Sequence, residues 1–312
     1  MKIVIVGPGA LGSLLAAFLI RSKEEVWLLD HNKERSQEIA QSGIKVEGVS
    51  GNWQVSPKIS ADINEIGPAD LLIISVKSYD TKQAISAIKP LIKEDSAVLT
   101  LQNGIGNIEI ITEAIGSERV IAGVTNLGAT FIKPGFIRHA GKGETAIGRI
   151  DGKMTVKMRS IRQIFNKAGL ETKISRDIKG LIWSKLIVNS GINALSAIVR
   201  LNNGRLTEFE GTKKIMRETV TEAMRIAKRK RIKLLFDDPL AKVEAVAEAT
   251  GPNISSMLQD VLRKKRTEID FINGVIVRQG QELGIPVPVN QVLVDLIKTI
   301  EATYKLTTKE DV

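Results

Sequence analysis

The chain has 312 residues, of which 43% are hydrophobic and 26% charged, a composition typical of a globular protein with two domains of ordinary size. It has no cysteine, which excludes disulfides, thiolate metal sites and a cysteine nucleophile, and only two histidines. The start shows no secretory leader, and no uninterrupted apolar run approaches the roughly 18 residues of a membrane span. We therefore expect a cytoplasmic protein that has no metal and does not bind membranes.

The formal net charge of +10 raises the question of a nucleic-acid partner. The basic residues concentrate at "KRKRIK" (228–233) and "RKKR" (263–266), but acidic residues stand close to both runs and no aromatic residue is interleaved with them. Such runs are usually solvated helix faces, and a stacking platform for bases needs aromatic side chains. The charge pattern thus predicts no nucleic-acid partner.

Strands and helices alternate along the first half of the chain. Short β-branched apolar runs predict strands at 2–7, 25–30, 69–77, 97–104 and 120–126. Longer amphipathic runs predict helices at 11–23, 33–43, 79–93 and 108–116. This alternation favours a parallel sheet with helices on both faces. The glycine-rich stretch 129–148 predicts antiparallel strands at the sheet edge, and nearly everything from residue 177 onward has helical periodicity.

The first predicted strand runs into the loop "VGPGALG". In dinucleotide-binding proteins the equivalents of Gly7, Gly9 and Gly12 make the tight turn, let the backbone approach the pyrophosphate, and pack the helix on the strand. The alternative is a glycine turn that binds nothing. Because the loop opens a βαβ unit whose second strand ends in Asp30, we interpret it as a nucleotide site. The predicted fold is α/β, with a Rossmann-type doubly wound domain at 1–175 and an all-α, substrate-binding and dimerisation domain at 176–312.

Two other predicted strands end in polar residues, Lys77 in "IISVKS" and Asn103 in "LTLQNGIG". An open α/β sheet binds its ligand beyond the carboxyl ends of its strands, so both residues are candidates for the same crevice as the glycine loop. A solvent-exposed loop position is the alternative for each of them.

A polar row crosses the apolar helix predicted at "WSKLIVNSGINAL" (183–195). Lys185, Asn189 and Asn193 are spaced four apart and so project from one helix face. A buried polar group left without a partner costs about 1–3 kcal/mol, so something polar is expected opposite this row. The alternatives are a bound substrate and polar backbone elsewhere in the fold.

The sequence resembles the ketopantoate reductase (2-dehydropantoate 2-reductase) family. The motifs that carry the resemblance extend from residue 7 to 288: "GPGALG", "SVKS", "QNGIG", "WSKLIVNSGINAL", "NNG", "NISSMLQD" and "RTEIDFINGVIVRQGQELGIPVP". The resemblance implies an oxidoreductase that reduces 2-dehydropantoate to (R)-pantoate with NAD(P)H, in pantothenate and coenzyme A biosynthesis.

The resemblance also implies roles for individual residues. It makes Lys185 the proton donor and assigns substrate binding to Asn103, Lys185, Asn189, Asn193, Asn203, Asn253 and Ser256. It assigns cofactor binding to Gly7, Pro8, Gly9, Ala10, Leu11, Gly12, Asp30, His31, Lys77, Asn103, the backbone of Ala129, and Glu268. The chemistry agrees, because reducing a 2-keto acid needs a cationic acid at the developing alkoxide, and burial makes a lysine a better acid.

The segment "TGPNISSMLQD" allows two interpretations. Ser255 and Ser256 are both candidate caps at a helix start, and a helix N-terminus is also a natural carboxylate site, for which we favour Ser256. Glu268 is expected to project from a following helix toward the substrate cleft. The alternative for Glu268 is a surface pair with Lys264, four residues earlier.

The preferred cofactor is open. Relatives that use NADPH commonly carry an arginine after the second strand, whereas this chain has Asp30 and His31, with Lys33 and Arg35 as the nearest cations. A strand-end acid typically binds the ribose 2′-hydroxyl, which favours NADH over NADPH. Two other functions also remain, a reductase of another 2-keto acid and a non-catalytic nucleotide-sensing or nucleic-acid-binding protein. We expect a homodimer formed through the helical domain.

Overall fold

The computed structural model describes residues 1–306, which divide into two compact units. Unit 1 comprises Met1–Gln102 and Gly106–Ile178, and unit 2 comprises Asn103–Ile105 and the chain from Lys179 onward. The boundary therefore falls at residue 178 rather than at 175, and three residues of the "QNGIG" motif belong with the helical part of the chain.

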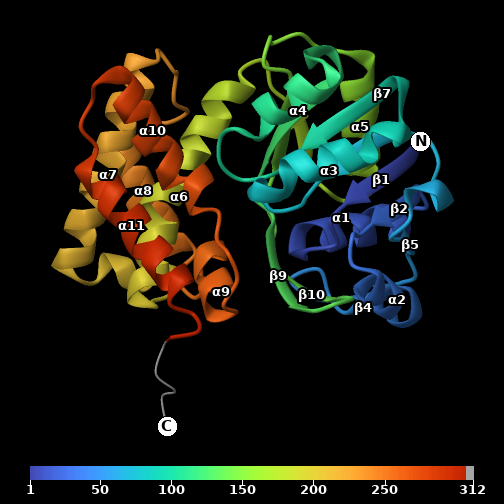
Figure 1. The fold of residues 1–312 in the computed structure, drawn as a ribbon, viewed down its shortest axis with the longest axis horizontal. Helices are drawn as coiled ribbons and strands as arrows, with labels where there is room; N and C mark the ends of the chain where they lie inside the picture. The colour runs from blue at the N-terminus through green and yellow to red at the C-terminus, as the bar shows by residue number, and fades with distance from the viewer. Residues whose placement is uncertain (307–312) are drawn as a thin grey trace. The chain divides into compact units, whose positions relative to one another are not determined.

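An eight-stranded sheet forms the centre of unit 1 (Figure 1). The strand order is β12-β11-β8-β7-β6-β1-β2-β5, and all neighbouring pairs are parallel except β8 and β11. Since β2 and β6 flank β1, the direction of winding reverses at β1, and the loop after this strand occupies the switch point. The strands are β1 (Lys2–Val6), β2 (Glu25–Leu29), β5 (Lys58–Ser60), β6 (Ala69–Ile74), β7 (Ile92–Thr100), β8 (Val120–Thr125), β11 (Thr145–Gly148) and β12 (Thr172–Ile174).

Helices cover both faces of this sheet, which confirms the predicted doubly wound α/β fold. The apolar faces of α1 (Ala10–Arg21) and α5 (Val156–Lys167) are buried on one side, and those of α3 (Thr81–Ile88) and α4 (Asn107–Ile115) on the other. Helix α2 (Lys33–Ser42) follows β2. The helix predicted at 79–93 ends earlier, because Pro90 lies in a 3-10 turn, Lys89–Leu91, and β7 begins directly after it.

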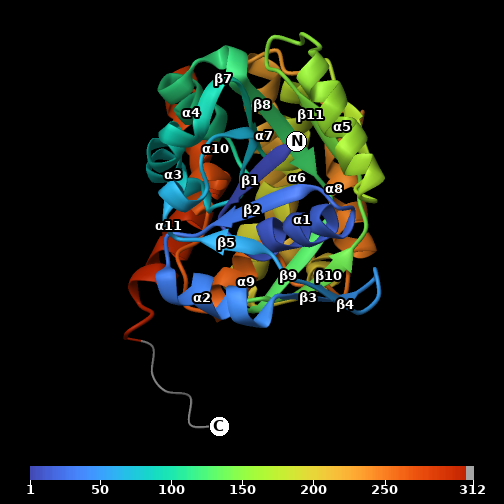
Figure 2. The same ribbon diagram turned by 90° about the vertical axis from the view of Figure 1, so that its right-hand side faces the viewer.

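A second, four-stranded sheet was not anticipated from the sequence. Its order is β4-β3-β10-β9, with β3 (Ile44–Gly48), β4 (Trp53–Val55), β9 (Gly128–Lys133) and β10 (Phe136–Gly141). Figure 2 shows it beside α1, which it contacts. The expectation of antiparallel edge strands at 129–148 is therefore correct only in part. β11 is antiparallel to β8, but β12 and not β11 is the edge strand, and β9 and β10 form an antiparallel pair in this separate sheet.

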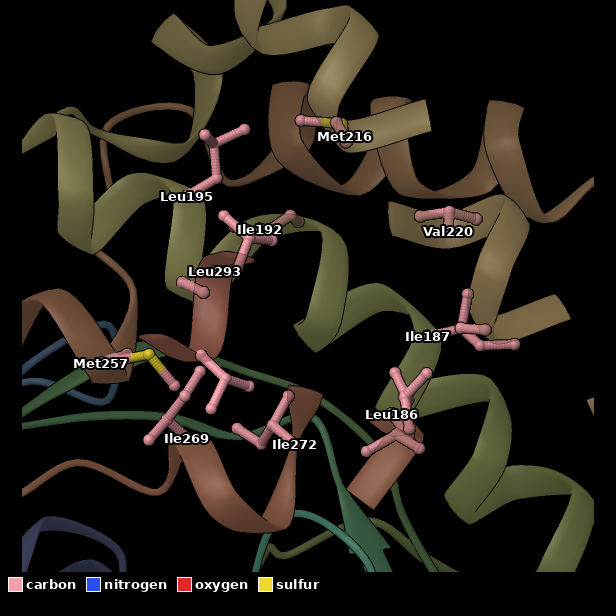
Figure 3. Packing of buried hydrophobic residues seen from close by; sticks show 14 of the residues in the cluster. Leu186, Ile187, Ile192, Leu195, Met216, Val220, Met257, Ile269, Ile272 and Leu293 are labelled. Carbon is pink, nitrogen blue, oxygen red and sulfur yellow. The ribbon is translucent and has the colours of Figure 1, made fainter. Parts of the chain in front are cut away.

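Unit 2 contains only helices and 3-10 turns in its described part, as predicted (Figure 1). Its buried apolar side chains come from several helices and form one cluster, part of which is shown in Figure 3. The elements are α6 (Ile178–Val199), η5 (Asn203–Thr207), α7 (Glu210–Arg229), α8 (Pro239–Ala249), α9 (Ser256–Leu262), η6 (Ile269–Phe271), α10 (Asn273–Leu283) and α11 (Pro288–Ala302).

Helix α6 supplies much of this core. Leu186, Ile187 and Ile192 are almost fully buried, and together they make α6 unusually apolar. Although polar residues interrupt its apolar runs, α6 is long enough and apolar enough on average to resemble a membrane span. In the most apolar stretch of α6, 67% is buried inside the structure. The apolar character of α6 is therefore explained by its packing in the core of unit 2.

Candidate functional site

The glycine loop between β1 and α1 requires glycine at its first and third glycine positions. Gly7 has φ of +97°, and a Cβ there would lie 2.7 Å from Cγ1 of Val76. A Cβ on Gly12 would overlap the carbonyl oxygen of Gly7. The predicted roles of these two glycines, a tight turn and close packing of helix on strand, therefore match the observed geometry.

Gly9 differs from its two neighbours. Its φ is −73°, and a Cβ placed on it would meet no atom within 4 Å. Glycine at this position leaves room directly before the first turn of α1, which begins at Ala10 and whose N–H groups have no intrahelical partner. Space beside exposed N–H donors is what a pyrophosphate requires, so these residues fit a dinucleotide.

Ser75, which the sequence analysis did not single out, holds this loop in place. Its hydroxyl donates to the carbonyl oxygens of Val6 and Gly7, at 3.0 and 2.8 Å. Ser75 comes directly after β6, and Lys77 follows two residues later as the N-cap of a 3-10 turn. The motif "SVKS" thus contains both a serine that stabilises the glycine loop and the lysine expected at this strand end.

Asp30 directly follows β2, and its backbone neighbour Leu29 accepts a hydrogen bond from the N–H of Gly7. Its side chain has no exposed surface, and both carboxylate oxygens bind Arg35, at 2.5 Å from Nε and 2.5 Å from Nη2. Oδ1 also accepts from the N–H of Asn32. His31, in contrast, has a side chain that is 80% exposed. The strand-end acid is therefore present as predicted, with an arginine already bound to it.

In unit 2, the α6 row consists of Lys185, Asn189 and Asn193 in successive turns of the helix. Desolvation lowers the pKa of Lys185 to about 8, and the negative charge of Glu268 acts against this change. A lysine with this pKa is still largely protonated at neutral pH and gives up its proton more readily than an exposed one. The residue predicted as proton donor therefore has the acidity that the role requires.

Glu268 does not project from a helix as expected. It lies in the turn before η6 and is 7% exposed. Lys264 comes after the end of α9 and has φ of +52°, so the helical surface pair with Glu268 is also wrong. Instead, the negative charge of Glu268 raises the pKa of Lys185.

The "QNGIG" loop reaches the same part of unit 2. The N–H of Ile105 donates to the carbonyl oxygen of Phe271 at 3.0 Å, and a Cβ on Gly104 would overlap that oxygen. Gly104, at φ of +82°, therefore permits the close approach. Nδ2 of Asn273 donates to the carbonyl oxygen of Ser190 and ties the start of α10 to α6. These contacts hold the loop that contains Asn103, and helix α6 that contains Lys185, against the segment that follows Glu268.

Ser255, and not Ser256, caps helix α9. Its hydroxyl accepts from the N–H of Leu258 at 3.1 Å and also from the hydroxyl of Ser196 at 2.6 Å. Ser256 is the first residue of α9 and is partly exposed. Since Ser255 performs the capping, the hydroxyl of Ser256 is not needed for it.

The two remaining substrate candidates lie where η5 meets the α8–α9 loop. Nδ2 of Asn203 donates to Oγ1 of Thr250, and its N–H donates to the carbonyl oxygen of Asn253. Asn203 is buried, with no partner for Oδ1 among the described residues, whereas Asn253 is exposed.

The cofactor candidate Ala129 belongs to unit 1, where it lies in β9 opposite His139.

No group of three or more His, Asp or Glu side chains within residues 1–306 is arranged to hold a metal ion.

Residues 3–152 match the family described as "Ketopantoate reductase PanE/ApbA", and residues 177–301 match "Ketopantoate reductase PanE/ApbA C terminal". The chain belongs to the ketopantoate reductase family. Family members named 2-dehydropantoate 2-reductase include one from Pyrococcus horikoshii, 38% identical over 97% of this chain and 98% of its own. One from Halobacterium salinarum is 35% identical over 96% of this chain and 98% of its own.

Several solved structures have the same fold as this chain. A PanE/ApbA family ketopantoate reductase from Ralstonia eutropha has a TM-score of 0.90 and 37% identity, covering 97% of this chain and 99% of its own. D-mandelate dehydrogenase, solved with NADH and anilino(oxo)acetate, also has a TM-score of 0.90, with 28% identity over 97% of this chain and 99% of its own.

Proposed function

We propose that this family member is a 2-dehydropantoate 2-reductase, an NAD(P)H-dependent oxidoreductase that forms (R)-pantoate. The observation that carries the proposal is Lys185, a partly buried lysine with a pKa of about 8, acted on by Glu268 and followed by Asn189 and Asn193 on one helix face. A chain that only bound nucleotides or nucleic acid would have no use for a tuned proton donor in its helical unit.

When bound, NAD(P)H supplies the hydride. The task of Lys185 is to polarise the ketone through its ammonium group and then to transfer a proton from Nζ to the oxygen as negative charge develops there. Because Lys185 is desolvated, its charge acts in a medium of low polarity, where it stabilises an alkoxide more strongly than in water. Glu268 keeps the lysine from losing its proton too early.

The carboxamides and the free serine suit the rest of the substrate. Asn189 and Asn193, one and two helical turns beyond Lys185, can each donate to a carboxylate and can both donate to and accept from a hydroxyl group. Ser256 stands at the start of a helix whose capping is performed by its neighbour, so its hydroxyl and N–H can address a carboxylate. This arrangement supports a 2-keto acid that carries a hydroxyl group, which 2-dehydropantoate does.

The family shares the use of a reduced nicotinamide dinucleotide, and the proposal covers both NADH and NADPH. The strand-end acid Asp30 favours NADH by the usual rule, whereas its bond to Arg35 supports NADPH. We further propose a cytoplasmic homodimer, for which the exposed side chains of Val292 and Leu296 on α11 offer apolar surface. Light scattering of the purified protein tests the dimer.

A reductase of another 2-keto acid is a second candidate, because D-mandelate dehydrogenase shares the fold with a TM-score of 0.90. A single experiment decides between them. Oxidation of NADPH and NADH is followed at 340 nm with 2-dehydropantoate, pyruvate, 2-ketoisovalerate and benzoylformate in turn. The proposal expects kcat/KM for 2-dehydropantoate to exceed the others by at least about tenfold, and a higher value for any other acid overturns it.

A further inference from the structure

A network of buried polar side chains lies in unit 1, beyond the carboxyl ends of β6 and β7. Its centre is the hydroxyl of Thr81, the first residue of α3, which has no exposed surface. Nε2 of Gln102 donates to this hydroxyl at 2.8 Å. The hydroxyl in turn lies 2.8 Å from both the carbonyl oxygen of Ser78 and Oδ1 of Asn107. The network thus joins the segment after β7, the start of α4 and the turn after β6.

The carboxamide of Gln102 fits this network in only one orientation. Its nitrogen also donates to the carbonyl oxygen of Val76 at 2.9 Å, and its oxygen accepts from the hydroxyl of Thr100 at 2.9 Å. A reversed carboxamide would set its oxygen against the carbonyl oxygen of Val76, and two acceptors cannot form a hydrogen bond. Both N–H donors of the carboxamide are therefore committed, one to Val76 and one to Thr81.

The backbone of Lys77 lies between two points that this network holds. Lys77 is the N-cap of the 3-10 turn Ser78–Asp80. Before it, the carbonyl oxygen of Val76 accepts from Gln102, and after it, the carbonyl oxygen of Ser78 accepts from the hydroxyl of Thr81. Since Gln102 and Thr81 also bind each other, the two points belong to one connected set of bonds.

This segment adjoins the glycine loop. β6 pairs in parallel with β1, and the hydroxyl of Ser75 donates to the carbonyl oxygen of Gly7. The ligand of a doubly wound sheet binds beyond the carboxyl ends of its strands, at the switch point. Lys77 therefore comes from the strand end next to the one that carries the glycine loop.

From this geometry we infer that Thr81 and Gln102 are positioning residues for cofactor binding, because they hold the backbone of Lys77 in the conformation that binds the dinucleotide. Thr81 has no exposed surface, so it acts only through the residues that it contacts. A segment fixed in advance loses less conformational entropy when it engages a ligand. This inference rests on the proposed use of a nicotinamide dinucleotide and on the role that the family resemblance implies for Lys77.

The test measures the dissociation constants of NADPH and NADH by fluorescence titration, without substrate. Thr81→Val keeps the shape of the side chain and removes the hydroxyl, so it should weaken binding of the preferred dinucleotide by about fivefold. Thr81→Ser keeps the hydroxyl and should bind within about twofold of the wild type. Gln102→Met has a side chain of similar length without donors, so it should resemble Thr81→Val, and it replaces that variant if Thr81→Val does not fold.

Thr172→Val is the matched control. Thr172 is also buried, in β12, four strands from β6 in the sheet order, and its hydroxyl donates to the carbonyl oxygen of Leu170 at 2.7 Å. Loss of this bond should lower Tm, as in Thr81→Val, and leave both dissociation constants unchanged. An equal loss of affinity in the two variants would follow from stability alone and would overturn the inference.

A double-mutant cycle with Lys77 separates positioning from a general structural role. Lys77→Ala alone should weaken binding by at least about tenfold, the effect of losing a charged hydrogen-bond donor. Adding Thr81→Val should then have almost no further effect, because the side chain that Thr81 positions is gone. Additive losses, unchanged affinity in Thr81→Val, or unchanged affinity in Lys77→Ala each overturn the inference.

Turnover of 2-dehydropantoate is measured separately. A protein that shows this coupling but does not reduce 2-dehydropantoate would contradict the proposed reaction and leave the role of Thr81 intact. Additive losses in a protein that does reduce it would contradict only the positioning role of Thr81 and Gln102. A wild-type protein that binds neither dinucleotide would contradict both.

Discussion

The nucleotide loop of unit 1 and the α6 row of unit 2 are built in opposite ways. The loop works through the absence of side chains, since Gly7 and Gly12 have no room for a Cβ and Gly9 leaves space beside the first turn of α1. The α6 row works through side chains whose charge is set by burial and by Glu268. In the proposed function, one region recognises its ligand by backbone N–H groups and space, and the other by polar side chains.

This difference predicts different consequences of substitution. A change in the loop should act on cofactor binding and hardly on the charge state of any residue. A change in the α6 row should act on the rate, on substrate binding or on the pH profile, with cofactor binding preserved.

The largest effect is expected for Lys185→Ala. Loss of the proton donor should lower kcat by at least about 10²-fold, the contribution typical of a positioned acid. The dissociation constant for NADPH, measured by fluorescence titration, should hardly change. Lys185→Arg keeps the charge but not the acidity, so it should restore substrate binding better than turnover. Retention of more than about a tenth of wild-type kcat, with chemistry rate-limiting, would show that another group donates the proton.

Ser255 and Ser256 should differ in which quantity their substitution changes, stability or substrate binding. Ser256→Ala should weaken substrate binding by about 1–3 kcal/mol, the usual result of removing a partner of a charged group, and should leave the free energy of unfolding almost unchanged. Ser255→Ala removes the α9 cap and the bond from Ser196, so it should lower the free energy of unfolding by about 1 kcal/mol. Steady-state kinetics and urea unfolding measure the two quantities. An unchanged KM for Ser256→Ala would remove this residue from the substrate site.

Within the loop, two glycines should respond differently to alanine. Gly9→Ala places its methyl group in open space, so the free protein should keep its Tm while NADPH binding weakens by about tenfold, through loss of the close backbone approach. Gly12→Ala forces a clash with the carbonyl oxygen of Gly7 and should lower both Tm and affinity. Gly211→Ala, which also adds a methyl group in open space, is the control for unit 2. Normal NADPH affinity in Gly9→Ala would contradict a pyrophosphate at this position.

The smallest effect is a change in the pH profile. The proton donor must be protonated, so kcat/KM should fall as the pH rises through the Lys185 pKa of about 8. The negative charge of Glu268 raises this pKa, so Glu268→Gln should move the alkaline limb to lower pH. Lys185→Arg should abolish the limb. A limb that stays in place in Glu268→Gln would indicate that the carboxylate does not act on the proton donor.

Much of the fold could be predicted because its signals are local. The alternation of apolar and polar residues that marks the strands and helices of residues 2–126, and the helices beyond 177, spans only a few residues. The glycine motif after β1 is equally short. The short strands β3 and β4 left no such signal. β3 pairs with β10, from a distant part of the sequence, and β4 pairs with β3. A distant pairing partner such as β10 cannot be read from a local pattern.

The sequence by itself determined which chemical groups this protein has and the helix face or strand end on which each stands. Lys185, Asn189 and Asn193 lie on one face of α6 because residues four apart share a face of any α-helix. Tertiary structure decided what those groups meet. The pairing of Asp30 with Arg35, the burial of Glu268 and its action on Lys185, and the fit of Gly104 against Phe271 all depend on how separate segments pack. Charge state and hydrogen-bond saturation follow from these contacts, since desolvation and partner choice arise only when the chain is folded.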